Sequence, residues 1–109
     1  MKETFETTAN ELGGQAEVLV EKSYPGFEVN ETDKVTQYAI SSALALGLKG
    51  DTCIAGGGSD GNIMNQYGIP SVILGVGYEN IHTTSERIAI KDMYMLTRQI
   101  IKIIELVAE

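Results

Sequence analysis

The fold of this chain is decided around one stretch, Asp51-Thr52-Cys53-Ile54-Ala55-Gly56-Gly57-Gly58-Ser59-Asp60-Gly61-Asn62. Residues 51–55 form a short, mostly apolar run between Gly50 and the glycines, which predicts a buried strand. The glycines predict a turn, and a short helix is expected over residues 62–67, closed by Gly68. A strand, a glycine turn and a helix in succession are typical of an α/β fold.

Helices and strands are expected to alternate on both sides of this stretch. Towards the N-terminus, the spacing of apolar residues predicts a helix over 3–12, a strand over 15–22 and an amphipathic helix over 33–48. Towards the C-terminus it predicts a strand over 69–74 and a long helix over 92–107. We therefore expect a mixed α/β fold.

Length and charge narrow the possible functions. The chain has 109 residues with 43% hydrophobic content, enough for one ordinary domain and too short for two comfortable ones. Its formal net charge is −7, and the eight basic residues are scattered along the sequence. Since a nucleic-acid-binding surface needs clustered basic residues, nucleic acid is excluded as a partner. The same negative charge argues against anionic membrane surfaces.

Cysteine usage and the N-terminal sequence point to the cytosol. Cys53 is the single cysteine, so the chain has no internal disulfide and no reason to reside in an oxidising compartment. Residues 1–6 lack a basic region followed by an apolar run, and no stretch approaches the roughly 20 apolar residues of a membrane span. We expect a cytoplasmic protein with no membrane partner.

The glycine-rich stretch is the first candidate binding site. Consecutive glycines allow backbone N–H groups to approach an anion, and Ser59 adds a hydroxyl donor. Gly56, Gly58 and Gly61 also satisfy the dinucleotide pattern G-x-G-x-x-G, but the helix that follows is short for that fold. No lysine follows the glycines, which excludes a triphosphate-binding P-loop. A purely structural turn is the simpler alternative.

His82 is the second candidate and the only histidine. Neutral imidazole is a common zinc ligand, but a catalytic zinc needs about three protein ligands, so this chain can supply only part of such a site. A lone histidine is otherwise an exposed or hydrogen-bonded side chain. Glu86 could be a neighbour of a ligand, a helix cap or a solvated residue, and we expect it to be solvated.

Four motifs follow one another in the second half of the chain, namely Gly57-Gly58-Ser59-Asp60-Gly61-Asn62, Tyr67-Gly68-Ile69-Pro70, Leu74-Gly75-Val76-Gly77 and His82-Thr83-Thr84-Ser85-Glu86. In order and spacing they resemble the end of the dinuclear zinc peptidases that include tripeptidase (peptidase T), glutamate carboxypeptidase, acetylornithine deacetylase and succinyl-diaminopimelate desuccinylase. The residues upstream resemble the second half of that family's ferredoxin-like lid, or dimerisation, domain.

The resemblance implies a fold and a division of the chain. Residues 1–55 would form the second half of the lid, and residues 56–109 would supply the last strand and helix of the catalytic domain. The remainder, an N-terminal part of the same enzyme, would lie outside this sequence. Apolar faces left uncovered without it make self-association or strand exchange expected, so a homo-oligomer is predicted.

The resemblance also implies a zinc-dependent hydrolase acting on small peptides, with two zinc ions in each complete active site. His82 would ligate one zinc, and Gly57, Gly58 and Ser59 would lie beside the carboxylate of the substrate. The family's His-x-Asp motif and its Glu-Glu pair do not occur in this sequence. No catalytic residue is therefore assigned here, and the chain alone is expected to be inactive. The alternatives are a small dinucleotide- or ligand-binding module that uses Gly56–Gly61 and a non-catalytic dimerisation module.

Overall fold

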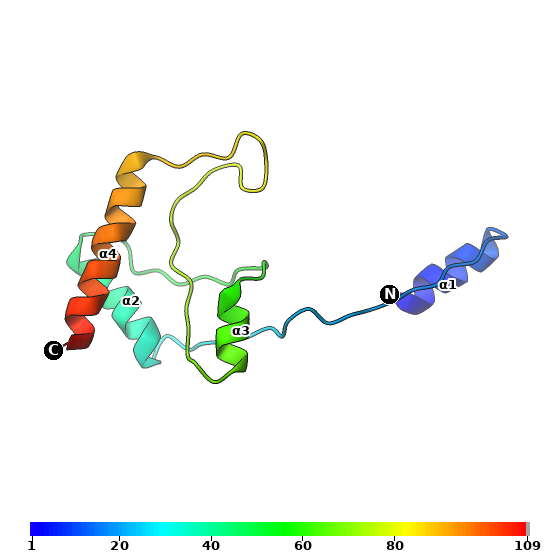
Figure 1. The fold of residues 1–109 in the computed structure, drawn as a ribbon, viewed down its shortest axis with the longest axis horizontal. Helices are drawn as coiled ribbons and strands as arrows, with labels where there is room; N and C mark the ends of the chain where they lie inside the picture. The colour runs from blue at the N-terminus through cyan, green and yellow to red at the C-terminus, as the bar shows by residue number, and fades with distance from the viewer. Residues whose placement is uncertain (109) are drawn as a thin grey trace.

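The computed structural model describes residues 1–108 and contains four helices in that range (Figure 1). They are α1 (Lys2–Glu11), α2 (Lys34–Ala45), α3 (Asp60–Gln66) and α4 (Ile90–Ala108). All four helices predicted from the sequence are confirmed, with ends that differ by one to three residues. Gly68, expected to close α3, has a φ of 76°, the left-handed conformation that glycine adopts without penalty at a helix end.

The predicted strands are not confirmed. Residues 15–22, 51–55 and 69–74 run as extended chain, and the one β-bridge within residues 1–108 joins Glu79 to Arg87. A strand needs a neighbouring strand to satisfy its backbone N–H and C=O groups, and none of these three segments lies beside a partner strand in the described part of the chain. The α/β pattern is therefore seen only as helices separated by extended segments.

The main packing contact joins α2 to α4. Small side chains make it possible, since Ser42 is fully buried and Ala43 is 6% exposed. The side chain of Gln99 crosses between the helices, where its Nε2 donates to the carbonyl oxygen of Ala39 at 3.2 Å. α2, which belongs to the predicted lid part (residues 1–55), thus packs on α4, which belongs to the predicted catalytic part (residues 56–109).

A second contact region surrounds α3. The Nδ2 of Asn62 donates to the carbonyl oxygen of Pro25 at 2.9 Å, which ties the helix to a segment far back in the sequence. Asn65 binds the extended segment that follows, because its Nδ2 donates to the Ser71 carbonyl at 2.9 Å and its Oδ1 accepts from the Ser71 N–H at 3.1 Å. Two asparagines therefore hold three parts of the chain together.

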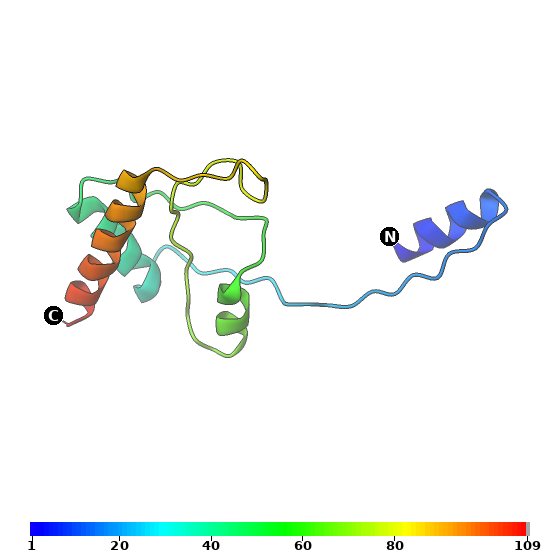
Figure 2. The same ribbon diagram turned by 45° about the horizontal axis from the view of Figure 1, so that its top comes forward.

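The N-terminal part stands away from the rest of the molecule. Figures 1 and 2 show α1 and the extended residues after it reaching out as an arm, and α1 has no buried residue. The radius of gyration is 19.9 Å, whereas a compact domain of this length would have about 13 Å. The chain is therefore more extended than a compact domain of its length.

Very little apolar surface is buried. Ala43 is the single buried hydrophobic residue within residues 1–108. Ile100, Ile101 and Ile104 of α4 remain 46–63% exposed although they follow a helical apolar pattern. Such extensive exposed apolar surface marks a contact region in a soluble protein. None of the described helices combines the length and the apolar character needed to cross a membrane.

Candidate functional site

The glycine loop, residues 56–59, connects an extended segment to α3. A Cβ built on Gly57 meets no atom within 4 Å, so nothing in the chain itself requires glycine there. A Cβ on Gly58 would lie 2.1 Å from the ring of Tyr24. Gly58 is therefore packed against Tyr24, and no sequence signal links two residues so far apart.

The backbone of the glycine loop is partly free to bind a ligand. The N–H of Ser59 is already used, since it donates to Asn62 Oδ1 at 2.8 Å. The N–H groups of Gly57 and Gly58 have no acceptor within residues 1–108. Of the predicted donors, Gly57 and Gly58 are thus available to an anion, whereas Ser59 can offer only its exposed hydroxyl, which lies 3.4 Å from Asn62 Oδ1.

Ser59 and Asn62 fix the end of this loop as the start of α3. Ser59 is the N-cap residue, and its φ of −152° is extended backbone. Asn62, only 6% exposed, returns a side-chain oxygen to the Ser59 N–H, the reciprocal arrangement of a capping box. The spacing Ser-x-x-Asn is the sequence signal for this role, which Ser59 has in addition to its predicted place beside the substrate.

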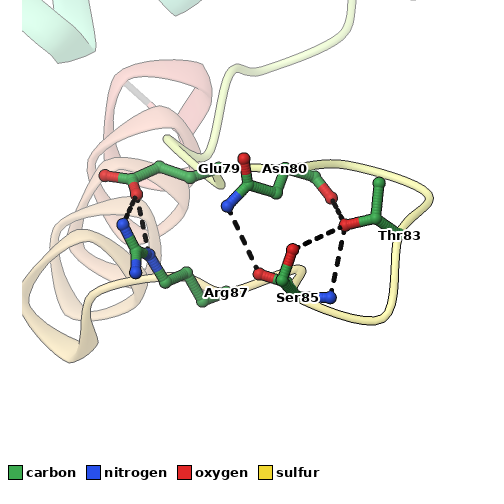
Figure 3. Close-up of polar contacts among 5 residues, drawn as sticks. All are labelled: Glu79, Asn80, Thr83, Ser85 and Arg87. Atoms are coloured by element: carbon green, nitrogen blue, oxygen red, sulfur yellow. Dashed lines mark hydrogen bonds and ion pairs between the residues drawn. The ribbon is translucent and has the colours of Figure 1, made fainter.

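The histidine loop, residues 80–86, is closed at its neck by Glu79 and Arg87. Their backbones pair in both directions, with N···O distances of 2.8 and 3.1 Å. Their side chains form an ion pair in which Nε and Nη2 of Arg87 donate to one oxygen of Glu79, at 2.8 and 2.5 Å (Figure 3). The backbone pair and the ion pair together make a small closed hairpin.

Polar side chains also stabilise the inside of the histidine loop. Thr83 Oγ1 donates to the Asn80 carbonyl at 2.7 Å, lies 3.0 Å from the Ser85 hydroxyl and accepts from the Ser85 N–H at 3.3 Å (Figure 3). Asn80 and His82 both have left-handed backbones, with φ values of 55° and 62°. The hydroxyl groups after His82 therefore stabilise the turn.

His82 is exposed, and its imidazole makes no hydrogen bond to any residue that the structure describes. Its backbone N–H donates to Oε2 of Glu86 at 2.7 Å. The prediction that Glu86 is merely solvated was wrong, because its carboxylate closes the loop around His82. The separation of four residues between His82 and Glu86 is the sequence feature that indicates this contact.

The chain fits a metal ion only as the donor of a single ligand. Within residues 1–108 no three His, Cys, Asp or Glu side chains are grouped so that they could hold a metal ion. A free imidazole on a closed loop is suitable as one zinc ligand, but zinc in a catalytic site takes about three from protein. The further ligands would have to come from outside the described residues.

The glycine loop and the histidine loop lie on the same side of the molecule. In both Figure 1 and Figure 2 they are found at the end of the packed part that is remote from the α2–α4 pair. Two segments well separated in the sequence, the glycine loop and the histidine loop, thus lie on one side of the molecule.

Comparison with known proteins gives consistent matches over nearly the whole chain. The model of peptidase family M20/M25/M40 matches residues 4–106. A solved tripeptidase from Staphylococcus aureus superposes with a TM-score of 0.86 at 59% identity, over 97% of this chain and 28% of that chain. The aminopeptidase PepT from Bacillus cereus gives 0.81 at 44% identity, over 99% of this chain and 29% of that one.

One curated protein, YqjE from Bacillus subtilis, is 41% identical over 105 residues, which are 96% of this chain and 28% of YqjE. The chain therefore spans little more than a quarter of the length of each of these relatives. The open shape of this chain superposes closely on parts of the two solved structures, so the same backbone arrangement occurs within much longer proteins.

Proposed function

This chain belongs to peptidase family M20/M25/M40, and from that premise we propose that it is the C-terminal part of a zinc-dependent peptidase that hydrolyses small peptides. The observation that carries the proposal is the match to a tripeptidase at 59% identity with a TM-score of 0.86. The aminopeptidase PepT gives independent support at 44% identity. The reaction class proposed is hydrolysis of a peptide bond next to a free terminus.

In this proposal His82 is one zinc ligand, and no catalytic residue comes from the chain itself. Zinc, when bound, would supply the Lewis acid that activates water and polarises the amide carbonyl. The chain's own part is to hold the imidazole at the tip of a closed loop. The general base and the remaining ligands of two zinc ions belong to the rest of the protein, so the chain alone is expected to be inactive.

The glycine loop is proposed to bind the substrate carboxylate. The unpaired N–H groups of Gly57 and Gly58 are the donors, and the small size of Gly57 leaves room for the ligand. Ser59 contributes only through its hydroxyl, because its N–H belongs to the capping box. Backbone donors of this kind bind a carboxylate without needing a positive side chain.

The missing part of the enzyme would also complete the fold. It would supply neighbours for the extended segments 51–55 and 69–74 and cover the exposed apolar face of α4. We propose in addition that the boundary between lid and catalytic parts lies before α2 instead of at residue 55, because α2 packs on α4. Homo-oligomerisation through uncovered apolar faces and a cytosolic location stay predictions.

A dinucleotide-binding module is not favoured. α3 has seven residues, which is short for the helix that follows a G-x-G-x-x-G turn. A dimerisation module remains compatible with the outstretched arm, but it does not account for a free imidazole on a closed loop.

The test is hydrolysis of tripeptides, dipeptides and N-acyl amino acids by the complete protein, with and without zinc. We expect zinc-dependent cleavage of short peptides, and none by the purified chain alone. Failure of the zinc-loaded complete protein to cleave any peptide, with N-acyl amino acids hydrolysed instead, would replace the peptidase proposal by a deacylase.

A further inference from the structure

The backbone of His82 adopts a conformation that needs support. With a φ of 62° it lies in the left-handed region, which is sterically unfavourable for an L-residue with a side chain. Because φ and ψ set the direction of the Cα–Cβ bond, this conformation determines from which side of the loop the imidazole extends. A contact that stabilises this backbone conformation therefore also fixes the place of the imidazole on the loop.

The Glu86 carboxylate is the group that touches this backbone directly. Its Oε2 accepts the His82 N–H at 2.7 Å, a short hydrogen bond of the charge-assisted kind. The imidazole, in contrast, has no partner of its own within residues 1–108 that could orient it. The orientation of His82 in this chain thus depends on its backbone and, through it, on Glu86.

We propose that Glu86 is a positioning residue, which holds the backbone of His82 so that its imidazole is presented to zinc. This inference rests on the proposed function, in which His82 is a metal ligand. Glu86 acts on the peptide N–H, so it orients the ligand without needing to contact the metal. Partners behind a ligand of this kind typically contribute about 10–100-fold to metal affinity.

The amide of glutamine provides the discriminating variant. In Glu86→Gln a side-chain oxygen can still accept the His82 N–H, whereas Glu86→Ala removes the acceptor altogether. Glu11→Ala is the matched control, because Glu11 is an exposed carboxylate at the end of α1, far along the chain from the histidine loop.

The experiment measures zinc affinity of the complete protein by competition with a chelator, together with the melting temperature of the metal-free protein. We expect Glu86→Ala to weaken zinc binding about 10–100-fold, Glu86→Gln to restore most of that loss, and Glu11→Ala to bind like the wild type. The melting temperature of the metal-free protein should change little in all three.

Other outcomes would overturn the proposal. Unchanged zinc affinity in Glu86→Ala would show that His82 needs no such support. Equal losses in Glu86→Gln and Glu86→Ala would show that Glu86 acts through its charge or as a ligand itself. His82→Ala, measured alongside, separates the two proposals. Full zinc retention in His82→Ala would refute the proposed function. Zinc loss in His82→Ala, together with wild-type zinc affinity in Glu86→Ala, would refute only the positioning role.

Discussion

The glycine loop and the histidine loop differ in where their support comes from. The glycine loop depends on residues far away in the sequence, since Gly58 packs on Tyr24 and the capping residue Asn62 binds Pro25. The histidine loop is closed by contacts that span eight residues or fewer, including the Glu79–Arg87 pair. The conformation of the histidine loop therefore depends on contacts within the loop itself. The conformation of the glycine loop depends on contacts with residues 24 and 25.

Asn62→Ala, which removes the long-range contacts of the glycine loop, should cause the largest loss of stability in the complete protein. The change leaves the Ser59 N–H and the Pro25 carbonyl without partners near a buried position. We expect a loss of about 1–3 kcal/mol in the free energy of unfolding, measured by urea denaturation. Asn10→Ala in the exposed arm is the control, and equal stability of the two variants would contradict the account.

Gly58→Ala should have the next largest effect on the glycine loop. The new methyl group would overlap the ring of Tyr24, and overpacking costs about 1–3 kcal/mol, with the lower end expected because this ring is half exposed and can move. In a Tyr24→Ala background the same change should cost much less. Additive losses in the double variant, followed by thermal denaturation, would show that the two residues do not share this contact.

Arg87→Ala probes the neck of the histidine loop, where a smaller effect is expected. Both side chains of the ion pair are well exposed, 72% for Arg87 and 61% for Glu79. Exposed pairs contribute about 0.2–1 kcal/mol, and their contribution falls with added salt. The backbone pairing between the two residues stays, so zinc affinity should change little. A large loss of stability that is insensitive to salt would mean that the pair is buried in the complete protein.

Gly57→Ala should change stability least of all. Its Cβ would point into open space, and no left-handed backbone is found there, so the free energy of unfolding should stay the same or rise by up to about 1 kcal/mol. If the loop binds the substrate carboxylate, the Michaelis constant should rise nevertheless. Steady-state kinetics beside melting curves would detect this split. Unchanged kinetics would remove Gly57 from the substrate site.

The sequence predicted the helices well because their signals are local. The apolar spacing of α4 and Gly68 after α3 lie within or next to the helix that they define. Strands could not be confirmed in the same way, because residues 51–55 and 69–74 have extended sequences but need a partner strand to become part of a sheet. A helix satisfies its own hydrogen bonds and a strand does not.

The candidate site was predictable in its residue types and less so in their roles. His82 was singled out as the only histidine, and the structure adds that its imidazole is free. Gly58 is predicted to lie beside the substrate or in a structural turn, and its packing on Tyr24 depends on a contact between distant segments that spacing cannot reveal. Short spacings also indicate two backbone hydrogen bonds, Ser59 N–H to Asn62 and His82 N–H to Glu86; the second contradicts the prediction that Glu86 is merely solvated, and the role of Ser59 at the substrate stays a prediction.

The most direct test of the central claim, that this chain contributes one metal ligand to a zinc peptidase, is the metal content of the complete protein with His82→Ala. We predict that bound zinc, measured by mass spectrometry after gel filtration, falls from two ions per subunit to about one, while the circular dichroism spectrum stays that of the wild type. Two ions retained, with normal peptide hydrolysis, would contradict the account.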